Sequence, residues 1–520
     1  MPRLSLKTDS SFYRKIAMGA IGVRAVCADL ASYGHDLVEL ERGSSESKIW
    51  KDVKRKRVRI PDLVCKKCGT RIECRAKNRP ELSMSHTATV AERSWDYGMV
   101  DSDWIAFPIC QPVKDKEEEW SSGQIKNFAS YWNERNWILW HKAGKINYFT
   151  VNAFRSVPSD KSSTKGVTEG SETSITWSAI FSTRNGRVKQ VSDEGIKVIR
   201  NSDNRPYTWK IKPGQMSRVI PGQIVEECQI LASGMPILTD KDLTCPGTLP
   251  DGLIQRLLDS RERTQRFTGI KLAKLHGFTD YREKVHEVVD DREEDIYVRL
   301  EGASYLSSIC EVSTKTQFMP FLSDADLQNR LEAVITLGET ETEESTEILG
   351  DILNDPSQAG FMRSASAWSL GKIGTERAQK LLVNAFTDIN KDLREDALEN
   401  IITLGNTSLN VLLDGIRRND EDIAAGCAEA IRQCDFIPIS ALENLASYLE
   451  RNGQDEVSSR WIVWLLGQMP IEPLVPAIAR LQDSKPELHY AMSVLWSFVN
   501  SWISKHWEMG PWLKEYINDE

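Results

Sequence analysis

A spacing of about 32 residues recurs through the second half of this 520-residue chain. All but one of the copies have an arginine, then small apolar residues and, in most copies, a Leu-Gly pair. Successive arginines are 33, 31, 33 and 31 residues apart, followed by a double interval of 66. A repeat of this length predicts stacked helical hairpins, because one hairpin cannot bury its apolar face alone. The repeated arginines are Arg266, Arg299, Arg330, Arg363, Arg394 and Arg460.

One copy, around residues 424–428, has no arginine in the matching place. The pattern resembles the short HEAT-like repeats of phycobilisome lyases, and the resemblance covers residues 250–500. It implies that small residues let paired helices approach closely, and that the array binds a protein partner or mediates self-association. Residues 251–520 hold 27 Lys/Arg against 46 Asp/Glu, a net charge of −19, which argues against direct wrapping of DNA.

Residues 59–77 combine an apolar run around Pro61-Asp62, a Cys-x-x-Cys-Gly turn and a second run with alternating charges. Alternate residues of a strand share a face, so Glu73, Arg75 and Lys77 should project together. The returning hairpin can bring Asp62 beside them. Two carboxylates next to cations form a site for a divalent metal and a phosphodiester. The alternative interpretation is the solvated face of a half-buried sheet.

This arrangement resembles the PD-(D/E)XK nuclease superfamily, which includes restriction endonucleases and archaeal Holliday-junction resolvases. The resemblance implies that Asp62 and Glu73 hold Mg²⁺ or Mn²⁺, with the carbonyl of Cys74 nearby. It also implies that Arg75 and Lys77 stabilise negative charge on the phosphate. Arg75 stands where the family usually has lysine. Arginine keeps its proton near neutral pH and is a poor base, so Lys77 can supply the missing amine.

The surrounding pattern predicts the element order α-β-β-β-α-β, which is the order that the nuclease resemblance implies. We expect a helix over 11–33, strands over 35–40, 57–64 and 71–76, a helix over 86–97 and a buried strand over 103–110. The first helix lacks the metal-binding glutamate that is frequent in the family. Its only acid is Asp29, and Glu39, Glu41 and Glu46 are open substitutes.

The fold class that we expect is multidomain α+β. An α/β nuclease-like core would occupy residues 1–145, a β-rich barrel or sandwich 146–248 and the helical solenoid 249–520. In the middle domain, turn residues separate strands expected over 146–154, 175–182, 188–191, 195–200, 207–211 and 223–232, with a polar loop over 158–173. No signature there indicates a ligand.

Basic residues concentrate around the nuclease-like motif. Residues 48–79 hold 13 basic and 3 acidic side chains, for which a phosphate backbone is the natural counter-charge. We therefore expect DNA binding, with RNA as an open alternative. A solvated basic face is the competing interpretation. The residues expected to contact phosphate are Lys54, Arg55, Lys56, Arg57 and Arg59.

Cys65 and Cys68 have the spacing of a zinc knuckle, but structural Zn²⁺ requires four ligands. No second Cys-x-x-Cys occurs in the chain. We expect a hairpin without metal, and bound zinc is the less favoured alternative. The remaining ligands would have to come from Cys27, Cys74, Cys110, His35 or His86.

The ten cysteines show no disulfide-like spacing, and no apolar run approaches the ~20 residues of a membrane span. These features predict a cytoplasmic protein without membrane contact. Overall, the sequence predicts a metal-dependent nuclease that cleaves DNA, is directed through a helical array and acts in defence against foreign DNA. The alternatives are a catalytically degenerate nucleic-acid-binding scaffold and an assembly adaptor.

Overall fold

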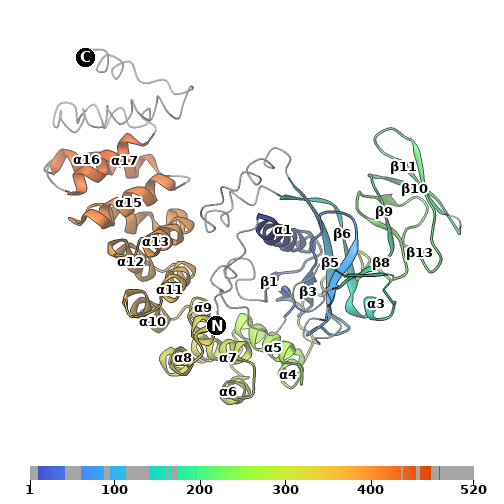
Figure 1. Ribbon diagram of the computed structural model, residues 1–520, viewed down its shortest axis with the longest axis horizontal. Helices are drawn as coiled ribbons and strands as arrows, with labels where there is room; N and C mark the ends of the chain where they lie inside the picture. The colour runs from blue at the N-terminus through green and yellow to red at the C-terminus, as the bar shows by residue number, and fades with distance from the viewer. Residues whose placement is uncertain are drawn as a thin grey trace, which may run out of the picture. The chain divides into compact units, whose positions relative to one another are not determined.

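The structure is a computed structural model. It describes residues 10–40, 60–86, 94–112, 140–159, 161–164, 173–193, 195–434, 437–452, 457–469 and 480. The chain divides into two compact units, Met1–Val312 and Ser313–Glu520 (Figure 1). No helix in these ranges is long and apolar enough to cross a membrane.

A five-stranded sheet lies at the centre of the first unit, in the order β1-β2-β3-β5-β6. The first three strands pair antiparallel, β5 runs parallel to β3, and β6 returns antiparallel to β5. A parallel pair requires a crossover, and the chain between β3 and β5 supplies it. The strands are β1 (Leu37–Glu39), β2 (Leu63–Cys65), β3 (Arg71–Cys74), β5 (Trp104–Pro112) and β6 (Trp140–Thr150).

One face of this sheet is covered by α1 (Ser10–Ala31), which lies beside β5 and β6 in Figure 1. Val26 and Leu30 are fully buried in a cluster that includes Ile72 of β3. The helix is followed by Gly34, whose φ of +88° suits a residue just beyond a helix. The predicted first helix is therefore present, and its apolar stripe faces the sheet.

The opposite face of the sheet packs on an aromatic core that continues into the next region. Phe107 and Phe149 of the sheet share this core with Trp177. Trp177 ends β8 (Thr173–Trp177), which pairs with β4 (Leu82–His86) on one side and β7 (Lys161–Thr164) on the other. The core also receives Phe154 from α3 (Val151–Arg155). The aromatic core and β6 therefore both cross the predicted boundary at residue 145.

Three local predictions differ from the structure. A helix was predicted over 86–97, but His86 ends a strand and residues 94–98 form turns. Residues 87–93 lie outside the described part. The predicted strand over 146–154 becomes a helix at Val151, where the Thr150 side chain caps the first turn. The polar segment predicted as a loop contributes β7. The domain boundaries themselves remain predictions.

The rest of the β-rich region forms two small sheets, ordered β12-β11-β10-β14 and β13-β15-β9. They enclose a separate cluster around Val188, Ile196, Val198 and Leu231. The strands are β9 (Ala179–Phe181), β10 (Gly186–Ser192), β11 (Gly195–Arg200), β12 (Pro206–Trp209), β13 (Met216–Ser217), β14 (Ile224–Val225) and β15 (Ile230–Ser233).

The predicted helical region is confirmed over the described residues from 253 to 467. Four helices complete the first unit: α4 (Leu253–Leu258), α5 (Arg263–His276), α6 (Arg282–Asp290) and α7 (Ile296–Ser308). Those described in the second unit are α8 (Thr314–Leu322), α9 (Leu327–Leu337), α10 (Glu343–Asn354), α11 (Gly360–Ile373), α12 (Glu376–Asn384), α13 (Lys391–Thr403), α14 (Leu409–Ile416), α15 (Glu421–Gln433), α16 (Ile439–Arg451) and α17 (Val457–Gly467).

The repeated arginine has a structural role in the helical pairs. Arg299 Nε donates to the carbonyl of Val289 at 2.9 Å, and Arg363 Nε donates to that of Leu353 at 2.8 Å. Both carbonyls lie ten residues earlier, in the last turn of the preceding helix, where carbonyls lack helical partners. The small residues let the helices pack closely, because a Cβ at Gly338 would lie only 2.9 Å from Ser369 Cα.

Candidate functional site

The predicted carboxylates lie where β2 and β3 separate. The two strands pair only through Leu63 with Ile72 and Val64 with Arg71. Asp62 precedes β2, and its Oδ2 accepts a hydrogen bond from the backbone N–H of Cys74 at 2.8 Å. Because the next N–H along the chain donates to β5, that of Cys74 points toward β2. The Asp62 carboxylate therefore accepts the hydrogen bond that a backbone carbonyl would accept if β2 and β3 continued to pair.

Glu73 and Arg75 lie on the same face of β3 and form an ion pair of 2.9 Å. The Glu73 side chain is 8% exposed and that of Arg75 is 19% exposed, so both are largely shielded from water. Arg75 Nη2 also donates to the carbonyl of Trp95 at 3.4 Å, while its Nε has no hydrogen-bond partner among the described residues. The carboxylate proposed to hold a metal is thus already paired with a cation.

Lys77 lies beyond the end of β3 and stays joined to β5 by its backbone. Its N–H donates to the carbonyl of Pro108 at 3.0 Å, and its carbonyl accepts from Cys110 at 2.7 Å. Burial of Glu81 opposes ionisation, but hydrogen bonds from Arg79 and Ser83 and the charges of Arg79 and Lys77 keep its pKa below its usual value. The positive charge of Lys77 therefore contributes to lowering the pKa of Glu81.

We call Asp62, Glu73, Cys74 and Arg75 the carboxylate–arginine cluster. Asp62 and Glu73 offer carboxylate oxygens, and Arg75 is the cation that neutralises Glu73. Burial raises the pKa of the Cys74 thiol well above its usual value, and the charge of Asp62 raises it further. Cys74 therefore offers a neutral thiol and a carbonyl oxygen. Two carboxylates and a carbonyl are ligands suited to Mg²⁺ or Mn²⁺, although Arg75 competes for Glu73.

Another predicted acid is bonded away from this cluster. Asp29, the one acid of the first helix, accepts a hydrogen bond from the Tyr148 hydroxyl at 2.8 Å. Glu41 and Glu46 lie outside the described residues. So do all of the predicted phosphate-binding residues, Lys54, Arg55, Lys56, Arg57 and Arg59.

A second cluster forms around the predicted zinc-knuckle cysteines. We call it the thiol–imidazole cluster, and its members are His35, Cys65, Cys68 and Cys245. Their potential ligand atoms all lie within 4.8 Å of one another. The contact with Cys68 lowers the pKa of the Cys65 thiol, whereas the same contact and burial raise the pKa of Cys68. His35 was among the residues expected to complete such a site. Cys27, Cys74, Cys110 and His86 are not members.

Sequence reasoning missed Cys245. It lies 180 residues from Cys65, in a segment with no cysteine motif of its own. The signal that could have pointed to it is only its neighbourhood, Cys-Pro-Gly, which marks a turn.

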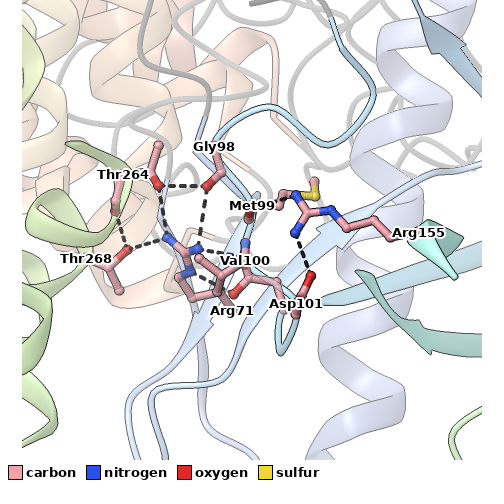
Figure 2. Close-up of polar contacts among 9 residues, drawn as sticks. Arg71, Gly98, Met99, Val100, Asp101, Arg155, Thr264 and Thr268 are labelled. Carbon is pink, nitrogen blue, oxygen red and sulfur yellow. Dashed lines mark hydrogen bonds and ion pairs between the residues drawn. The ribbon is translucent and has the colours of Figure 1, made fainter. Parts of the chain in front are cut away.

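Sequence reasoning also missed the buried arginine behind the carboxylates. Figure 2 shows Arg71 reaching from β3 to Thr264 and Thr268 of α5, at 3.3 and 3.4 Å. Its guanidinium also forms an ion pair with Asp103, and both side chains are under 5% exposed. The Thr264 hydroxyl donates to the carbonyl of Gly98 at 2.7 Å. This network fastens β3 and the turn before β5 to the first helical pairs.

Comparison with known proteins bears on the helical part. A family model of HEAT repeats matches residues 316–402, which run from within α8 to within α13. This segment therefore consists of HEAT repeats, as the arginine spacing predicted. No curated protein sequence matches the chain.

Several solved structures have low sequence identity to this chain. The Escherichia coli YibA protein is 16% identical over 48% of this chain and 93% of its own, with a TM-score of 0.24. Human deoxyhypusine hydroxylase is 16% identical over 48% and 96%, with a TM-score of 0.20. The CpcE–CpcF complex of the Nostoc phycocyanin lyase is 16% identical over 46% and 92%, with a TM-score of 0.21. Similarity at this level carries no information on function.

Proposed function

We propose that the chain is a scaffold that binds a protein partner through its helical array and nucleic acid through its first unit, without cleaving the nucleic acid. The observation that carries the proposal is the match of HEAT repeats to residues 316–402, because stacked repeats of this kind form extended binding surfaces. Residues 313–520 hold 17 Lys/Arg against 33 Asp/Glu, a net −16. A basic protein surface is the complement that such an array would bind.

The opposite charge of the first unit supports nucleic-acid binding there. Residues 1–312 hold 49 Lys/Arg against 42 Asp/Glu, a net +7, and the excess is concentrated in residues 48–79. Lysine and arginine side chains displace counterions from a phosphate backbone, which gives affinity without sequence preference. The partner of this unit is therefore DNA, with RNA as the alternative that the binding assay below decides.

The Glu73–Arg75 ion pair is the reason to propose binding without cleavage. A metal that activates water needs anionic ligands free to approach it. Glu73 is instead paired with an arginine that cannot lose its proton at neutral pH. A lysine at position 75 would be a shorter, more mobile cation, so Arg75→Lys is the substitution most suited to release Glu73.

The contact between Asp62 and Cys74 favours a second candidate, metal-dependent hydrolysis of DNA. Asp62, Glu73 and the Cys74 carbonyl would hold Mg²⁺ or Mn²⁺, which supplies Lewis-acid chemistry at a phosphodiester. Arg75 and Lys77 would hold the phosphate and offset its charge. Cleavage under the control of a partner on the helical array would suit defence against foreign DNA.

One assay separates the two candidates. The full chain is incubated with single-stranded, duplex and branched DNA and with RNA, in Mg²⁺ or Mn²⁺, and both binding and cleavage are followed. The scaffold proposal expects salt-sensitive binding and intact substrate. Cleavage that is lost in Asp62→Asn and Glu73→Gln, but kept in the neighbouring control Glu81→Gln, would replace the scaffold with the nuclease. Absence of nucleic-acid binding would leave only the protein-binding role.

A further inference from the structure

We propose that the thiol–imidazole cluster, His35, Cys65, Cys68 and Cys245, binds one structural zinc ion. The Cys65 and Cys245 sulfurs are 3.9 Å apart, and Cys68 Sγ lies 3.7 Å from His35 Nδ1. A tetrahedral ion with Zn–S near 2.3 Å and Zn–N near 2.0–2.1 Å places neighbouring donor atoms roughly 3.5–3.8 Å apart. The four donors therefore already surround a space of the right size.

The Cys65–Cys68 hairpin is shaped to direct both sulfurs to one side. The N–H of Gly69 donates to the carbonyl of Cys65 at 2.8 Å, and the N–H of Cys65 donates to that of Thr70 at 2.9 Å. Gly69 has φ of +75°, a left-handed conformation that favours glycine. These bonds close the turn that a Cys-x-x-Cys-Gly sequence forms around a metal. The Thr70 hydroxyl also lies 3.2 Å from Cys68 Sγ, where it can donate to a thiolate.

The imidazole is oriented as a ligand. His35 Nε2 lies 3.0 Å from the carbonyl of Leu243, so it carries the proton and donates. Nδ1 is then left with its lone pair directed at the cysteines. Metal-ligating histidines commonly make such a bond to a carbonyl, which fixes the tautomer and the ring. His35 is 5% exposed as a residue, so water is nearly excluded from this side of the site.

The donor set identifies the ion. Three sulfurs and one imidazole nitrogen, all from the protein, favour zinc over the oxygen-seeking Mg²⁺ and Ca²⁺. Four protein ligands leave no position for water, which is the pattern of structural rather than catalytic zinc. A disulfide is the competing use of the cysteines, but its sulfurs would be about 2.0 Å apart and it would leave the third thiol and the oriented imidazole without a role.

The ion would join three distant parts of the first unit. His35 lies between α1 and β1, Cys65 ends β2 with Cys68 in the turn before β3, and Cys245 precedes α4. Direct contacts already converge there: the N–H of Cys245 donates to the carbonyl of Tyr33 at 2.9 Å, and His276 Nε2 lies 2.8 Å from the carbonyl of Lys66. A Cβ at Gly69 would lie 2.4 Å from Leu253 of α4. Zinc would hold this hairpin, and the Asp62 beside it, against the first helical pair.

Metal content of the full chain tests the proposal without any nucleic acid. The protein is equilibrated with zinc, desalted and analysed by mass spectrometry of the metal. We expect about one zinc per chain, and at least a tenfold lower occupancy in Cys65→Ser and Cys245→Ser. Cys110→Ser is the matched control, because Cys110 is also buried but lies outside the cluster. Cys245→His keeps a zinc ligand at this position and should retain the ion.

Two measurements on the unmodified chain keep the test decisive even if a variant fails to fold. Mercurial titration of the thiols should release zinc in step with modification of three cysteines, and cobalt substitution should give the absorption of a tetrahedral thiolate site. Zinc below about a tenth of an equivalent would overturn the proposal. So would a Cys65–Cys245 disulfide in the unreduced protein, or equal zinc in Cys245→Ser and the unmodified chain.

Discussion

The contacts inside one compact unit join residues that are close in sequence, whereas those inside the other join residues far apart. In the second unit, Arg363 bonds a carbonyl ten residues earlier, and Ser369 bonds the carbonyl of Val334, 35 residues away. In the first unit, Cys65 meets Cys245 across 180 residues, and Arg71 meets Thr264 across 193. The second unit can therefore form from neighbouring repeats, whereas the first unit depends on closure of long segments.

This difference also shows in how each unit uses buried arginine. Arg363 and Asp388 are joined between adjacent helical pairs and the aspartate is 18% exposed. Arg71 and Asp103 are joined within the central sheet and are 3% and 4% exposed. The arginine of each pair makes a further bond: Arg363 bonds the carbonyl of Leu353 at a helix end, and Arg71 bonds Thr264 and Thr268 of α5.

The largest effect is expected from truncation. A fragment of residues 1–248 ends at the boundary predicted from the sequence and removes Thr264 and Thr268 from Arg71. We expect it to lack a cooperative unfolding transition, while a fragment of 1–312 should unfold cooperatively. Circular dichroism during denaturant titration of both fragments is the measurement. Equal cooperativity would mean that the helical pairs are dispensable to the sheet.

The next largest effect is expected from Arg71→Ala in the full chain. This substitution leaves Asp103 buried without its cation, which typically costs about 3–5 kcal/mol of unfolding free energy. Arg79→Ala is the control, because its ion pair with Glu81 has an arginine that is 76% exposed and should contribute about 0–1 kcal/mol. Denaturant unfolding measures both variants. A loss below about 1 kcal/mol for Arg71→Ala would contradict the fastening role of this residue.

A smaller loss is expected from Arg363→Ala in the array. The substitution removes the bond to the Leu353 carbonyl and the pair with Asp388, but Asp388 can regain water, so we expect about 2–3 kcal/mol. Arg377→Ala is the exposed control, since its pair with Glu347 lies at the surface. The helical signal of the fragment 313–520 reports the change. A loss as large as that of Arg71→Ala would remove the contrast between the units.

The smallest effect is expected from Asp396→Asn, and it should stabilise. Burial raises the pKa of Asp396 to about 6, so the folded state disfavours the charged carboxylate. A raised carboxyl pKa means that stability falls as the pH rises from about 4, the unfolded value, to about 6. Asparagine removes this cost and can still accept the hydrogen bond from Ser364.

We expect Asp396→Asn to add about 1–2 kcal/mol at pH 7 and nothing near about pH 2.5, where aspartate is neutral in both states. Asp351, which is exposed on α10, provides the control, as Asp351→Asn. Denaturant titrations of the fragment 313–520 at both pH values are the measurement. A gain of equal size at the two pH values would show that ionisation is not its cause.

Much of the molecule followed from the sequence where the determining contacts are local. The arginine period predicted the helical pairs because the determining contacts recur from repeat to repeat: Arg299 and Arg363 each bond a carbonyl ten residues earlier, and small residues lie at the helix contact. Alternation predicted that Glu73 and Arg75 share a face, since side-chain direction along a strand is set by the backbone. The first helix and the strands β1 and β3 were predicted for the same reason, through apolar periodicity and turn residues. Of the strand expected over 57–64, residues 60–62 are not in a strand, and β2 covers only Leu63–Cys65.

The rest could be decided only by the tertiary structure. Nothing near Cys245 indicates a partner at Cys65, and nothing near Arg71 indicates Thr264, because many positions in a chain of this length offer a thiol or a hydroxyl. The segment expected as a helix over 86–97 begins in β4, which pairs with β8 across about 90 residues of chain. Closing such a loop costs conformational entropy that grows only slowly with its length, so the sequence does not favour one distant partner over another. Packing of the whole first unit makes that choice, whereas each helical pair of the second carries the choice in its own residues.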